Sequence, residues 1–500
     1  MQRTNAHSLR VRRIGIDTYR EAVIYMRRDC AVCRSEGFEA QARIRVRGLR
    51  RSIIATLNVV APELLAEDEV GLSDAGFEML DAMEGESVDI AHPEPLESMS
   101  HVRRKVYGGR LGADAIDEIV RDVAAGRYAD VEIAAFVTAC AGANLDRGEI
   151  AALTRAMVAS GETLHWSASP VLDKHSVGGL PGNRTTPIVV SIVAACGLTI
   201  PKTSSRAITS AAGTADVMET LAPVDLDLPH MRRVVESEGG CVVWGGSVRL
   251  SPADDLLIRV ERTLDIDSDG QLVASVLSKK VAAGSTHVVI DVPLGPTAKV
   301  RTHEAAQRLE DHLIAIGRSV GLEVRVSYSD GAQPIGRGIG PALEARDVLA
   351  VLRGEVGAPA DLRARALELA GALLELAGRA ARGEGAVLAR ATLESGAAWA
   401  KLQAICEAQG GMRQPPVALH QRPVGASRSG RVDGIDNRRL ARIAKLAGAP
   451  FSPAAGVELH VALESAIERG QPLFTLHASS PGELAYALEY VSATDAIRID

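Results

Sequence analysis

Two stretches of this 500-residue chain combine glycines, hydroxyls and cations in the manner of an oxyanion-binding loop. The first runs from Asp173 to Thr186 (DKHSVGGLPGNRTT) and leads into an apolar segment that begins at Ile188. Lys174 and Arg184 supply positive charge, and a glycine turn before a helix lets backbone N–H groups face an anion. The hydroxyl donors are Ser176, Thr185 and Thr186, and the glycines are Gly178, Gly179 and Gly182. The spacing is not that of a Walker A loop. The stretch predicts a phosphate site of another kind, and an ordinary glycine turn before a buried helix is the alternative.

The second stretch runs from Lys202 to Thr214 (KTSSRAITSAAGT) and contains six hydroxyls and two cations. A Ser/Thr-rich segment of this kind is often only a loop. Two donor-rich loops joined by an apolar helix, however, face one cavity when they follow neighbouring strands of a sheet. Together they would suit a substrate that carries both a phosphate group and sugar hydroxyls.

A third candidate is the run Leu264–Gly270 (LDIDSDG), in which three aspartates alternate. A strand would place them on one face, and burial would raise the pKa of one of them enough for general-acid work. A calcium loop would need a glutamate at position 276, which is Val276. A solvated turn is the simpler interpretation for at least two of the aspartates.

Cys30 and Cys33 form one isolated C-x-x-C motif. No second pair follows at the spacing of a zinc ribbon. Two half-buried thiols are the simpler interpretation, and a metal or redox role is the alternative. Six cysteines in 500 residues are too few for a disulfide scaffold and favour a reducing cytoplasm.

The composition excludes several classes of function. A net charge of −7 argues against binding to a nucleic-acid polymer, and 15 aromatic residues are few for a base-stacking surface. The sequence contains no run of 18 apolar residues, so it predicts no membrane span, and its N-terminus does not resemble a signal peptide. We therefore expect a cytoplasmic protein that acts on a small molecule, with neither a membrane nor a nucleic acid as partner.

Charge and hydrophobic periodicity divide the chain into five parts. Residues 1–60 carry a net charge of +8 and residues 61–100 one of −12. This reversal indicates either a small module that folds on itself, with basic strands against an acidic edge, or a module that docks elsewhere. Residues 1–86 are predicted to form a β-rich N-terminal extension, with strands at 43–47 and 52–60. Residues 95–172 are predicted to be a helical domain, 173–345 an α/β domain with a largely parallel sheet, 346–424 a helical continuation and linker, and 425–500 an α+β C-terminal domain.

Several motifs resemble those of the thymidine and pyrimidine-nucleoside phosphorylase family. They are DKHSVGG at 173–179, SSRAITSAAGTADVMETLAPV at 204–224, ASVLSKK at 274–280 and GVELHVALESAIERGQPLFTL at 456–476. The N-terminal extension and the loop GGLPGNRTT resemble a long-chain branch, which holds archaeal AMP phosphorylases and bacterial proteins named as thymidine phosphorylases. The resemblance implies a helical domain, an α/β domain and a C-terminal α+β domain, assembled as a homodimer or a larger homo-oligomer.

The activity that the resemblance implies is phosphorolysis. Inorganic phosphate, the co-substrate, attacks the anomeric carbon of a nucleoside, thymidine in the first place, and releases the base and a pentose 1-phosphate. Phosphate is already a nucleophile, so neither a metal nor a cofactor is implied. The enzyme has to hold the anion, orient the sugar and protonate the leaving base.

The resemblance also assigns residues. Phosphate or substrate contacts fall on Lys174, Ser176, Thr186, Ser204 and Thr214. In the long-chain branch the nucleotide site is lined by Gly179, Ser205, Arg206, Ala207, Ile208, Thr209, Ser210, Thr214, Ser275 and Lys299, and the general acid falls on Asp267. In the shorter thymidine enzymes His175, Ser275 and Lys279 lie near the base, with His175 as a second catalytic candidate. Those enzymes place an arginine fifteen residues before the serine, where this chain has Val260 flanked by Arg259 and Arg262.

Three alternatives stay open. A nucleoside 5′-monophosphate phosphorylase, acting on AMP or CMP, would give a ribose 1,5-bisphosphate and would use the donors at 202–210 for the additional phosphate. A phosphoribosyltransferase of related architecture would need a metal, for which Asp254 and Asp255 are the nearest paired acids. A nucleotide sensor without catalysis would use the basic N-terminal module as a docking surface.

Overall fold

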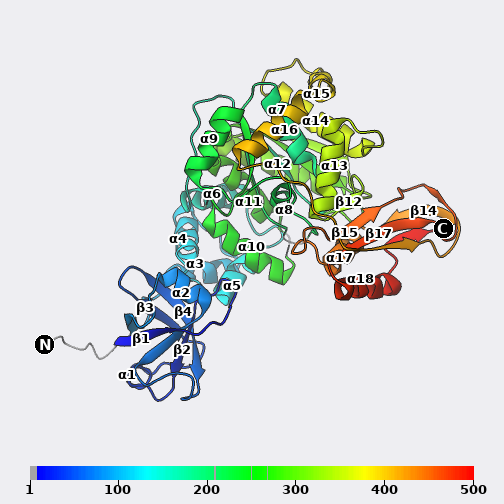
Figure 1. Cartoon of the computed structure of the whole chain (residues 1–500). Helices are drawn as coiled ribbons and strands as arrows, with labels where there is room; N and C mark the ends of the chain where they lie inside the picture. Colours follow the sequence, from blue (N-terminus) through cyan, green and yellow to red (C-terminus); the bar gives the residue numbers. More distant parts are fainter. Residues whose placement is uncertain (1–7, 208–209, 249, 267) are drawn as a thin grey trace. The chain divides into compact units, whose positions relative to one another are not determined.

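The computed structural model describes residues 8–207, 210–248, 250–266 and 268–500, and the chain has the mixed α/β fold that the sequence predicts. It divides into two compact units, residues 1–139 and residues 140–500 (Figure 1). No helix among the described residues is long and apolar enough to cross a membrane.

The first unit begins with a closed β-barrel. Its strands are β1 (Ser8–Arg13), β2 (Val23–Arg27), β3 (Arg43–Arg47), β4 (Ser52–Val60), β5 (Glu69–Leu72) and β6 (Ser87–Ala91), in the order β1-β5-β2-β4-β3-β6. The period-two pattern of β3 turns Ile44 and Val46 into the barrel, where both are 0% exposed. Two short helices, α1 (Ala31–Glu36) and α2 (Asp74–Leu80), belong to the same module.

The charge reversal along the sequence becomes a set of ion pairs within this module. Arg10 lies 2.8 Å from Asp68 and Arg13 lies 2.6 Å from Asp74. Each pair joins the basic first part of the barrel to its acidic second part, as expected for a module that folds on itself. The helices α3 (Met99–Val106), α4 (Ala113–Ala124) and α5 (Asp130–Cys140) follow along the chain.

The second unit is built on parallel strands. β7 (Leu172–Ser176), β10 (His287–Leu294) and β11 (Glu323–Asp330) pair in the order β11-β10-β7, and β8 (Ile200–Ser204) pairs with β9 (Gly240–Trp244). A parallel bridge between Val171 and Thr199 links the two groups. The carboxyl ends of β7 and β8 therefore lie side by side, and both polar loops of the sequence leave the sheet there.

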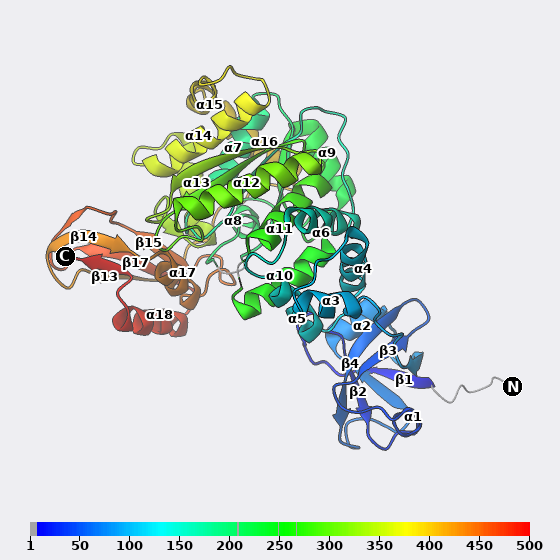
Figure 2. The ribbon, with the colours of Figure 1, turned by 180° about the vertical axis from the view of Figure 1, so that it is seen from behind.

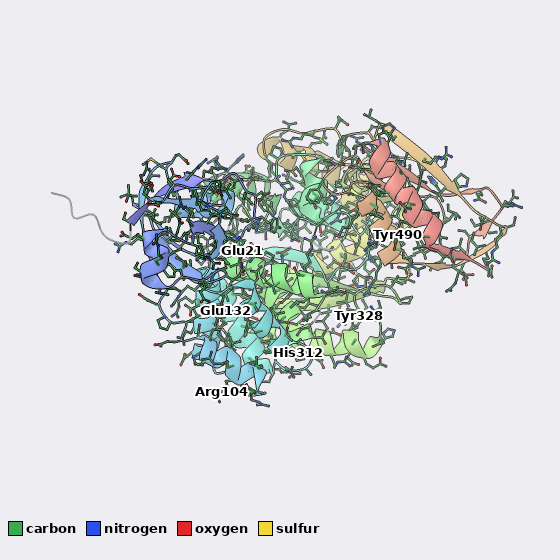
Figure 3. The ribbon with its side chains drawn as sticks, turned by 90° about the horizontal axis from the view of Figure 1, so that it is seen from below. Glu21, Arg104, Glu132, His312, Tyr328 and Tyr490 are labelled. Atoms are coloured by element: carbon green, nitrogen blue, oxygen red, sulfur yellow. The ribbon has the colours of Figure 1, made fainter. Side chains whose placement is uncertain are left out.

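Helices pack around these strands and against one another. They are α6 (Arg147–Ala159), α7 (Thr185–Ala195), α8 (Thr214–Glu219), α9 (Leu228–Glu238), α10 (Pro252–Leu264), α11 (Asp269–Ala282), α12 (His303–Ser319), α13 (Pro341–Arg353), α14 (Ala360–Leu376), α15 (Gly385–Glu394) and α16 (Ala397–Ala408). In Figure 1, α7 and α16 lie in front of the strands. In the opposite view of Figure 2, α12 lies in front of them. The hydroxyl of Tyr328 on β11 donates to Glu310 on α12, the helix that also carries His312 (Figure 3). All residues of α7 from Thr185 to Ala194 are buried, as its apolar sequence predicts.

The described residues of the run with three alternating aspartates do not form a strand, and the solvated turn that the sequence favours is seen at Asp265. α10 ends at Leu264, Asp265 adopts the left-handed conformation with φ 52°, and α11 begins at Asp269. An aspartate tolerates this conformation better than most residues, so the chain turns at Asp265, where α10 ends. Asp267 itself lies outside the described residues.

The C-terminal part contains two small sheets and two helices. The strands are β12 (Gly338–Ile339), β13 (His420–Gly425), β14 (Gly430–Ile435), β15 (Gly456–Leu459), β16 (Ala466–Ile467), β17 (Pro472–Ala478) and β18 (Ile497–Ile499), in the orders β12-β15-β17-β13 and β16-β14-β18. Helices α17 (Asn437–Leu446) and α18 (Pro481–Ala493) pack together, with the guanidinium of Arg442 5.5 Å from the ring centroid of Tyr490 (Figure 3). Strand β12 comes from the loop that precedes α13, so the α/β part of the chain contributes an edge to a C-terminal sheet.

Candidate functional site

The glycine turn after β7 brings the backbone close to two other segments. Gly179 has φ 81°, and a Cβ atom there would lie 2.4 Å from the backbone nitrogen of Lys299. Gly182 has φ 70°, and a Cβ atom there would lie 2.1 Å from the carbonyl oxygen of Ile335. Only glycine fits such positions. The turn thus brings the predicted residues Gly179 and Lys299 together, although 120 positions separate them in the sequence.

Two lysines contact one aspartate of β7, and a third lysine follows that aspartate on the same strand. The Nζ atom of Lys280 lies 2.7 Å from Asp173 Oδ2, and that of Lys202 lies 3.5 Å from Asp173 Oδ1. The third member, Lys174, donates to Thr185 Oγ1 over 2.7 Å. The lysines are 2–4% exposed and Asp173 is 0% exposed. We call Asp173, Lys174, Lys202 and Lys280 the buried lysine cluster.

The neighbouring carboxylate, Asp291, is also buried, and it accepts hydrogen bonds from Asn183 and Ser329. Asn183 also donates to Ser176 Oγ over 3.3 Å, which places that predicted hydroxyl beside the cluster. Three ammonium groups thus face two carboxylates. The buried surplus of positive charge would be compensated by a bound anion.

Burial lowers the affinity of two of these lysines, Lys174 and Lys202, for protons. It lowers the pKa of Lys174 to about 8, with Arg184 and Arg365 acting in the same direction. Burial likewise lowers the pKa of Lys202 to about 7, although Asp173 opposes the shift. A buried ammonium group is disfavoured unless a counter-charge is present. An anion bound here would raise both pKa values and draw protons onto the lysines.

His175 follows Lys174 on β7. Burial lowers the pKa of His175 well below its usual value, and the surrounding lysines lower it further, with Lys280 first and Lys202 next. The imidazole is therefore neutral at pH 7. A neutral imidazole can donate one hydrogen bond and accept another, but it is not a standing cation.

The second predicted loop begins on β8, since Lys202, Thr203 and Ser204 are strand residues. Ser204 is 9% exposed, and its hydroxyl has no hydrogen-bond partner among the described residues. Its neighbour Ser205 is exposed. A buried hydroxyl at the end of a strand is suited to form a hydrogen bond with a ligand.

Acidic side chains of α8 hold this loop through hydrogen bonds and an ion pair. Asp216 accepts the N–H groups of Ala207 and Gly213 over 2.6 and 2.8 Å. Arg206 forms an ion pair with Glu219, and its guanidinium lies 5.0 Å from the ring centroid of Trp244. Of the remaining predicted residues of this loop, Ser210 donates to the carbonyl oxygen of Ala212, and Ile208 and Thr209 lie outside the described residues.

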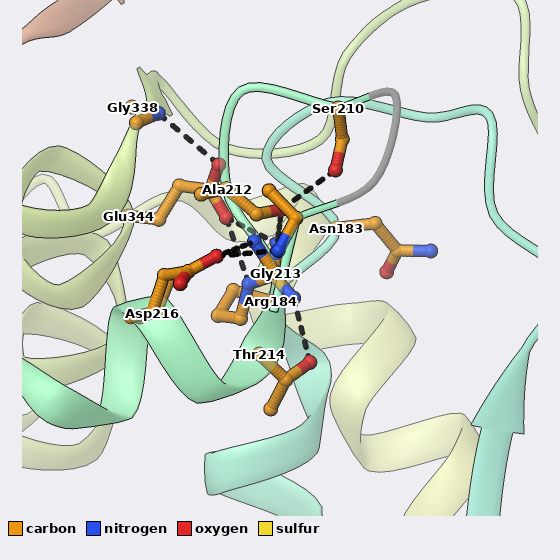
Figure 4. Close-up of polar contacts among 12 residues, drawn as sticks. Asn183, Arg184, Ser210, Ala212, Gly213, Thr214, Asp216, Gly338 and Glu344 are labelled. Carbon is orange, nitrogen blue, oxygen red and sulfur yellow. Dashed lines mark hydrogen bonds and ion pairs between the residues drawn. The ribbon is translucent and has the colours of Figure 1, made fainter. Parts of the chain in front are cut away.

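Arg184 joins the two loops to a third element (Figure 4). Its guanidinium donates to Thr214 Oγ1 over 2.6 Å and to the carbonyl oxygen of Ala212 over 3.0 Å. On its other side it forms an ion pair of 2.7 Å with Glu344 of α13, which is 1% exposed. The cation that the sequence suggests for an anion is thus already paired. Its role in this structure is to hold Thr214 and the turn before α8.

A further group lies on α10 and α11. Lys279 donates to Ser275 Oγ over 3.1 Å and forms an ion pair of 2.6 Å with Asp254. Ser275 and Lys279, both predicted as site residues, are therefore in direct contact. Asp254 is 1% exposed and is already paired with a cation, while the side chain of Asp255 is exposed. Because Asp254 is already paired with Lys279, it is not available as one of the two carboxylates suggested for a metal.

The sequence reasoning did not identify Asp173, Lys280 or Glu344 as parts of these networks. Lys280 could have been noticed, because it stands beside Lys279 in the ASVLSKK motif. Asp173 stands one position before Lys174, but nothing local shows that it meets two lysines from other strands and helices. Glu344 comes from an otherwise ordinary amphipathic helix, 160 positions after its partner.

Three family descriptions match successive parts of the chain. Residues 100–161 match the helical bundle domain of a glycosyl transferase family, and residues 168–399 match its a/b domain. Residues 431–499 match the pyrimidine nucleoside phosphorylase C-terminal domain.

Similar proteins extend over almost the whole length. A protein of Polaromonas sp. named "Putative thymidine phosphorylase" is 65% identical over 97% of this chain and 95% of its own. One of Hahella chejuensis with the same name is 60% identical over 98% of this chain and 97% of its own. Anthranilate phosphoribosyltransferase from Thermus thermophilus has a similar fold, with a TM-score of 0.52 and 22% identity over 62% of this chain and 98% of its own.

Proposed function

Because the chain belongs to the thymidine and pyrimidine-nucleoside phosphorylase family, we propose that it catalyses phosphorolysis of a pyrimidine nucleoside. The family makes the chain a pentosyltransferase. In the proposed reaction, thymidine and phosphate give thymine and 2-deoxyribose 1-phosphate. The observation that supports it most strongly is the buried lysine cluster, whose surplus positive charge adjoins the unpartnered hydroxyl of Ser204.

The phosphate would be held by charge and by hydroxyls. Ser176 and Ser204 end two adjacent strands, Lys174 lies two residues before Ser176, and Thr214 is oriented by Arg184. An anion bound among them would favour the charged forms of Lys174 and Lys202, whose pKa values burial lowers to about 8 and 7. Folding has already removed the lysines of this site and the hydroxyl of Ser204 from water. The phosphate therefore enters a preorganised electrostatic environment.

In the chemical step a phosphate oxygen forms a bond to the anomeric carbon as the bond between that carbon and the base nitrogen breaks. The electron pair of the broken bond stays on the base, which needs a proton or a strong hydrogen bond. We propose Asp267 as the donor of that proton. We place the contacting pair Ser275 and Lys279, together with the neutral imidazole of His175, at the base.

A second candidate is phosphorolysis of a nucleoside 5′-monophosphate on the same scaffold. The observation that favours it is Val260, which stands where the shorter thymidine enzymes have an arginine and is 5% exposed within α10. The ligand contact supplied by that arginine has no counterpart at this position. The donors of the second loop would then hold the additional phosphate.

A single substrate screen separates these candidates. The purified protein is incubated with thymidine, uridine, AMP or CMP, with and without phosphate, and the released base is measured by chromatography. We expect thymine release that requires phosphate. Release of base from AMP or CMP and none from thymidine would overturn the thymidine assignment but retain phosphorolysis. Binding without turnover of any substrate would instead support a sensor.

The same assay tests the general acid. Asp267→Asn is expected to retain substrate binding and to lose turnover by about 10²–10⁴-fold, most for bases that leave slowly. Asp269→Asn is the matched control, because Asp269 is an exposed residue in the first turn of α11. Equal losses in both variants would argue against Asp267.

We further propose a homodimer that works in the cytoplasm without metal or cofactor. Light scattering on the purified chain tests the oligomeric state. Undiminished turnover in a chelator, with inorganic phosphate as co-substrate, would exclude the metal-dependent phosphoribosyltransferase.

A further inference from the structure

Two thiols of the N-terminal barrel share one helical turn. Cys30 caps the N-terminus of α1, and its Sγ atom accepts the backbone N–H of Cys33 over 3.2 Å. Both cysteines are free, and they are 1% and 4% exposed. Cysteines separated by two residues at the start of a helix have the spacing at which redox-active dithiols close into a disulfide.

The two thiols are chemically unequal. The hydrogen bond from the Cys33 thiol, with further hydrogen bonds from the N–H groups of Cys33 and Val32, lowers the pKa of Cys30 to about 6. The same thiol–thiol hydrogen bond and burial raise the pKa of Cys33. Cys30 is thus the thiolate at neutral pH, and Cys33 keeps its proton. This asymmetry distinguishes an attacking sulfur from a resolving one.

The charged groups beside the pair are few. Asp29 precedes Cys30, and its carboxylate is held by two hydrogen bonds from Arg27 of β2. Arg34 donates from α1 to the carbonyl oxygen of Asp29. The other neighbours belong to the apolar core of the barrel, and among them are Val32 and Phe38. The local hydrogen bonds, rather than a cluster of cations, therefore stabilise the thiolate.

We propose that Cys30 and Cys33 form a redox-active dithiol, which small hydroperoxides oxidise to an intramolecular disulfide. The co-reactant is small because neither sulfur is open to a bulky molecule. This site is independent of the phosphorylase function proposed above and lies in a different part of the chain.

The reaction balances in two steps. The Cys30 thiolate attacks the peroxide, so that an S–O bond forms, the O–O bond breaks and the leaving hydroxide takes up a proton to become water. The sulfur of Cys33 then attacks the sulfenic sulfur, an S–S bond forms and the S–O bond breaks. The departing hydroxide takes the Cys33 proton and leaves as a second water. The two sulfurs together supply the two electrons that reduce the peroxide.

The full chain is suited to a direct test by mass spectrometry. Trypsin cleavage after Arg28 and Arg34 gives one peptide, DCAVCR, which contains both thiols. The native protein is exposed to dilute hydrogen peroxide, unfolded in an alkylating agent and digested. We expect this peptide to lose two hydrogens and resist alkylation, and dithiothreitol to reverse the change.

Cys406 provides an internal control, since it is 0% exposed and burial raises its pKa to about 12. Its peptide should remain reduced at the same dose. Oxidation of DCAVCR should be about tenfold slower at pH 5 than at pH 7, because thiolate forms with a pKa of about 6. Cys33→Ser should give a sulfenic acid on Cys30, trapped by a dimedone probe, and no disulfide.

Equal oxidation of the Cys406 peptide and DCAVCR in the wild-type chain would overturn the proposal, since it would show unfolding or indiscriminate attack. A DCAVCR peptide that stays fully alkylatable would also overturn it. Both outcomes are read in the wild-type protein, so the proposal can be refuted even if the Cys33→Ser variant does not fold.

Discussion

The ammonium group of Lys280 lies 2.7 Å from the carboxylate of Asp173, and both side chains are buried where α11 meets the parallel sheet. Lys202 reaches the same carboxylate from β8. One aspartate thus compensates two lysines from different elements. The compensation of positive charge in the buried lysine cluster therefore depends on Asp173.

Asp173→Asn should lower the free energy of unfolding by about 3–5 kcal/mol, because it leaves buried ammonium groups without this counter-charge. Urea denaturation measures the loss. The double variant Asp173→Asn with Lys280→Met should lose less than the sum of the two single variants, because it removes one of the uncompensated charges. Additive losses would contradict the direct coupling of Lys280 to Asp173.

Anion binding should weaken as the pH rises from 6 to 9. The sign follows from the lowered pKa values of Lys202, about 7, and Lys174, about 8. Below pH 7 both lysines are charged before the anion arrives. Above it the anion must draw protons onto them, which costs binding free energy. Sulfate is the appropriate probe, because its own charge is constant over this range, and calorimetry measures its affinity.

Lys202→Met is the matched variant for that measurement. It should flatten the decline of sulfate affinity with pH, because one of the two titrating lysines is gone. An affinity for sulfate that does not change between pH 6 and 9 in the wild-type protein would show that the lysines are not linked to the anion.

Gly179→Ala should reduce turnover by about 10²-fold, because the new Cβ would lie 2.4 Å from the backbone nitrogen of Lys299 and displace that segment. Gly178→Ala provides the control, since Gly178 also has positive φ but has nothing within 4 Å of an added Cβ. The control should lose only about 1–2 kcal/mol of folding stability, through backbone strain. Equal kinetic effects would mean that strain, rather than contact with Lys299, matters.

Arg184→Met should cost about 3–5 kcal/mol of stability, because Glu344 would remain buried without its cation. It should also lower turnover, since Thr214 loses the donor that orients its hydroxyl. Replacing both partners, with Glu344→Leu in addition, should restore part of the stability but not the turnover. Recovery of both would show that Thr214 does not depend on Arg184.

Asp254→Asn should lower kcat/KM by about tenfold, because Lys279 loses its buried partner and the orientation that this gives beside Ser275. Asp255→Asn changes the neighbouring, exposed carboxylate and should have an effect within about twofold. The steady-state rates of the two variants with the best substrate of the screen provide the comparison. Matching losses would refute the positioning role of Asp254.

Local sequence was sufficient to predict the elements and the polar loops. Strand β3 follows from alternation at 43–47, β4 coincides with the strand predicted at 52–60, and α7 follows from its apolar run. The cations at 174 and 202 were visible because their glycine- and hydroxyl-rich surroundings are unusual. Such features depend on residues a few positions apart, which a single sequence displays directly.

The partners of those cations could not be predicted, because tertiary structure brings them together. Asp173 meets Lys280 across 107 positions, and Arg184 meets Glu344 across 160. Arg184 therefore looked available for an anion although the fold pairs it with a carboxylate. The alternation of aspartates at 265–269 does not indicate a strand, because period two does so only where the backbone is extended, whereas Asp265 is left-handed and Asp269 begins α11.

The pairing of β12 with β15 imposes an order on biosynthesis. Gly340 and Gly456 let the two segments approach so closely that a Cβ atom at either position would lie 2.3 or 2.1 Å from a carbonyl oxygen of the other segment. The β12 edge has no partner strand until residues 456–459 have left the ribosome. The α/β part of the chain therefore completes this edge only after β15 has been synthesised, and termination before β15 would release a nascent chain with an exposed strand edge.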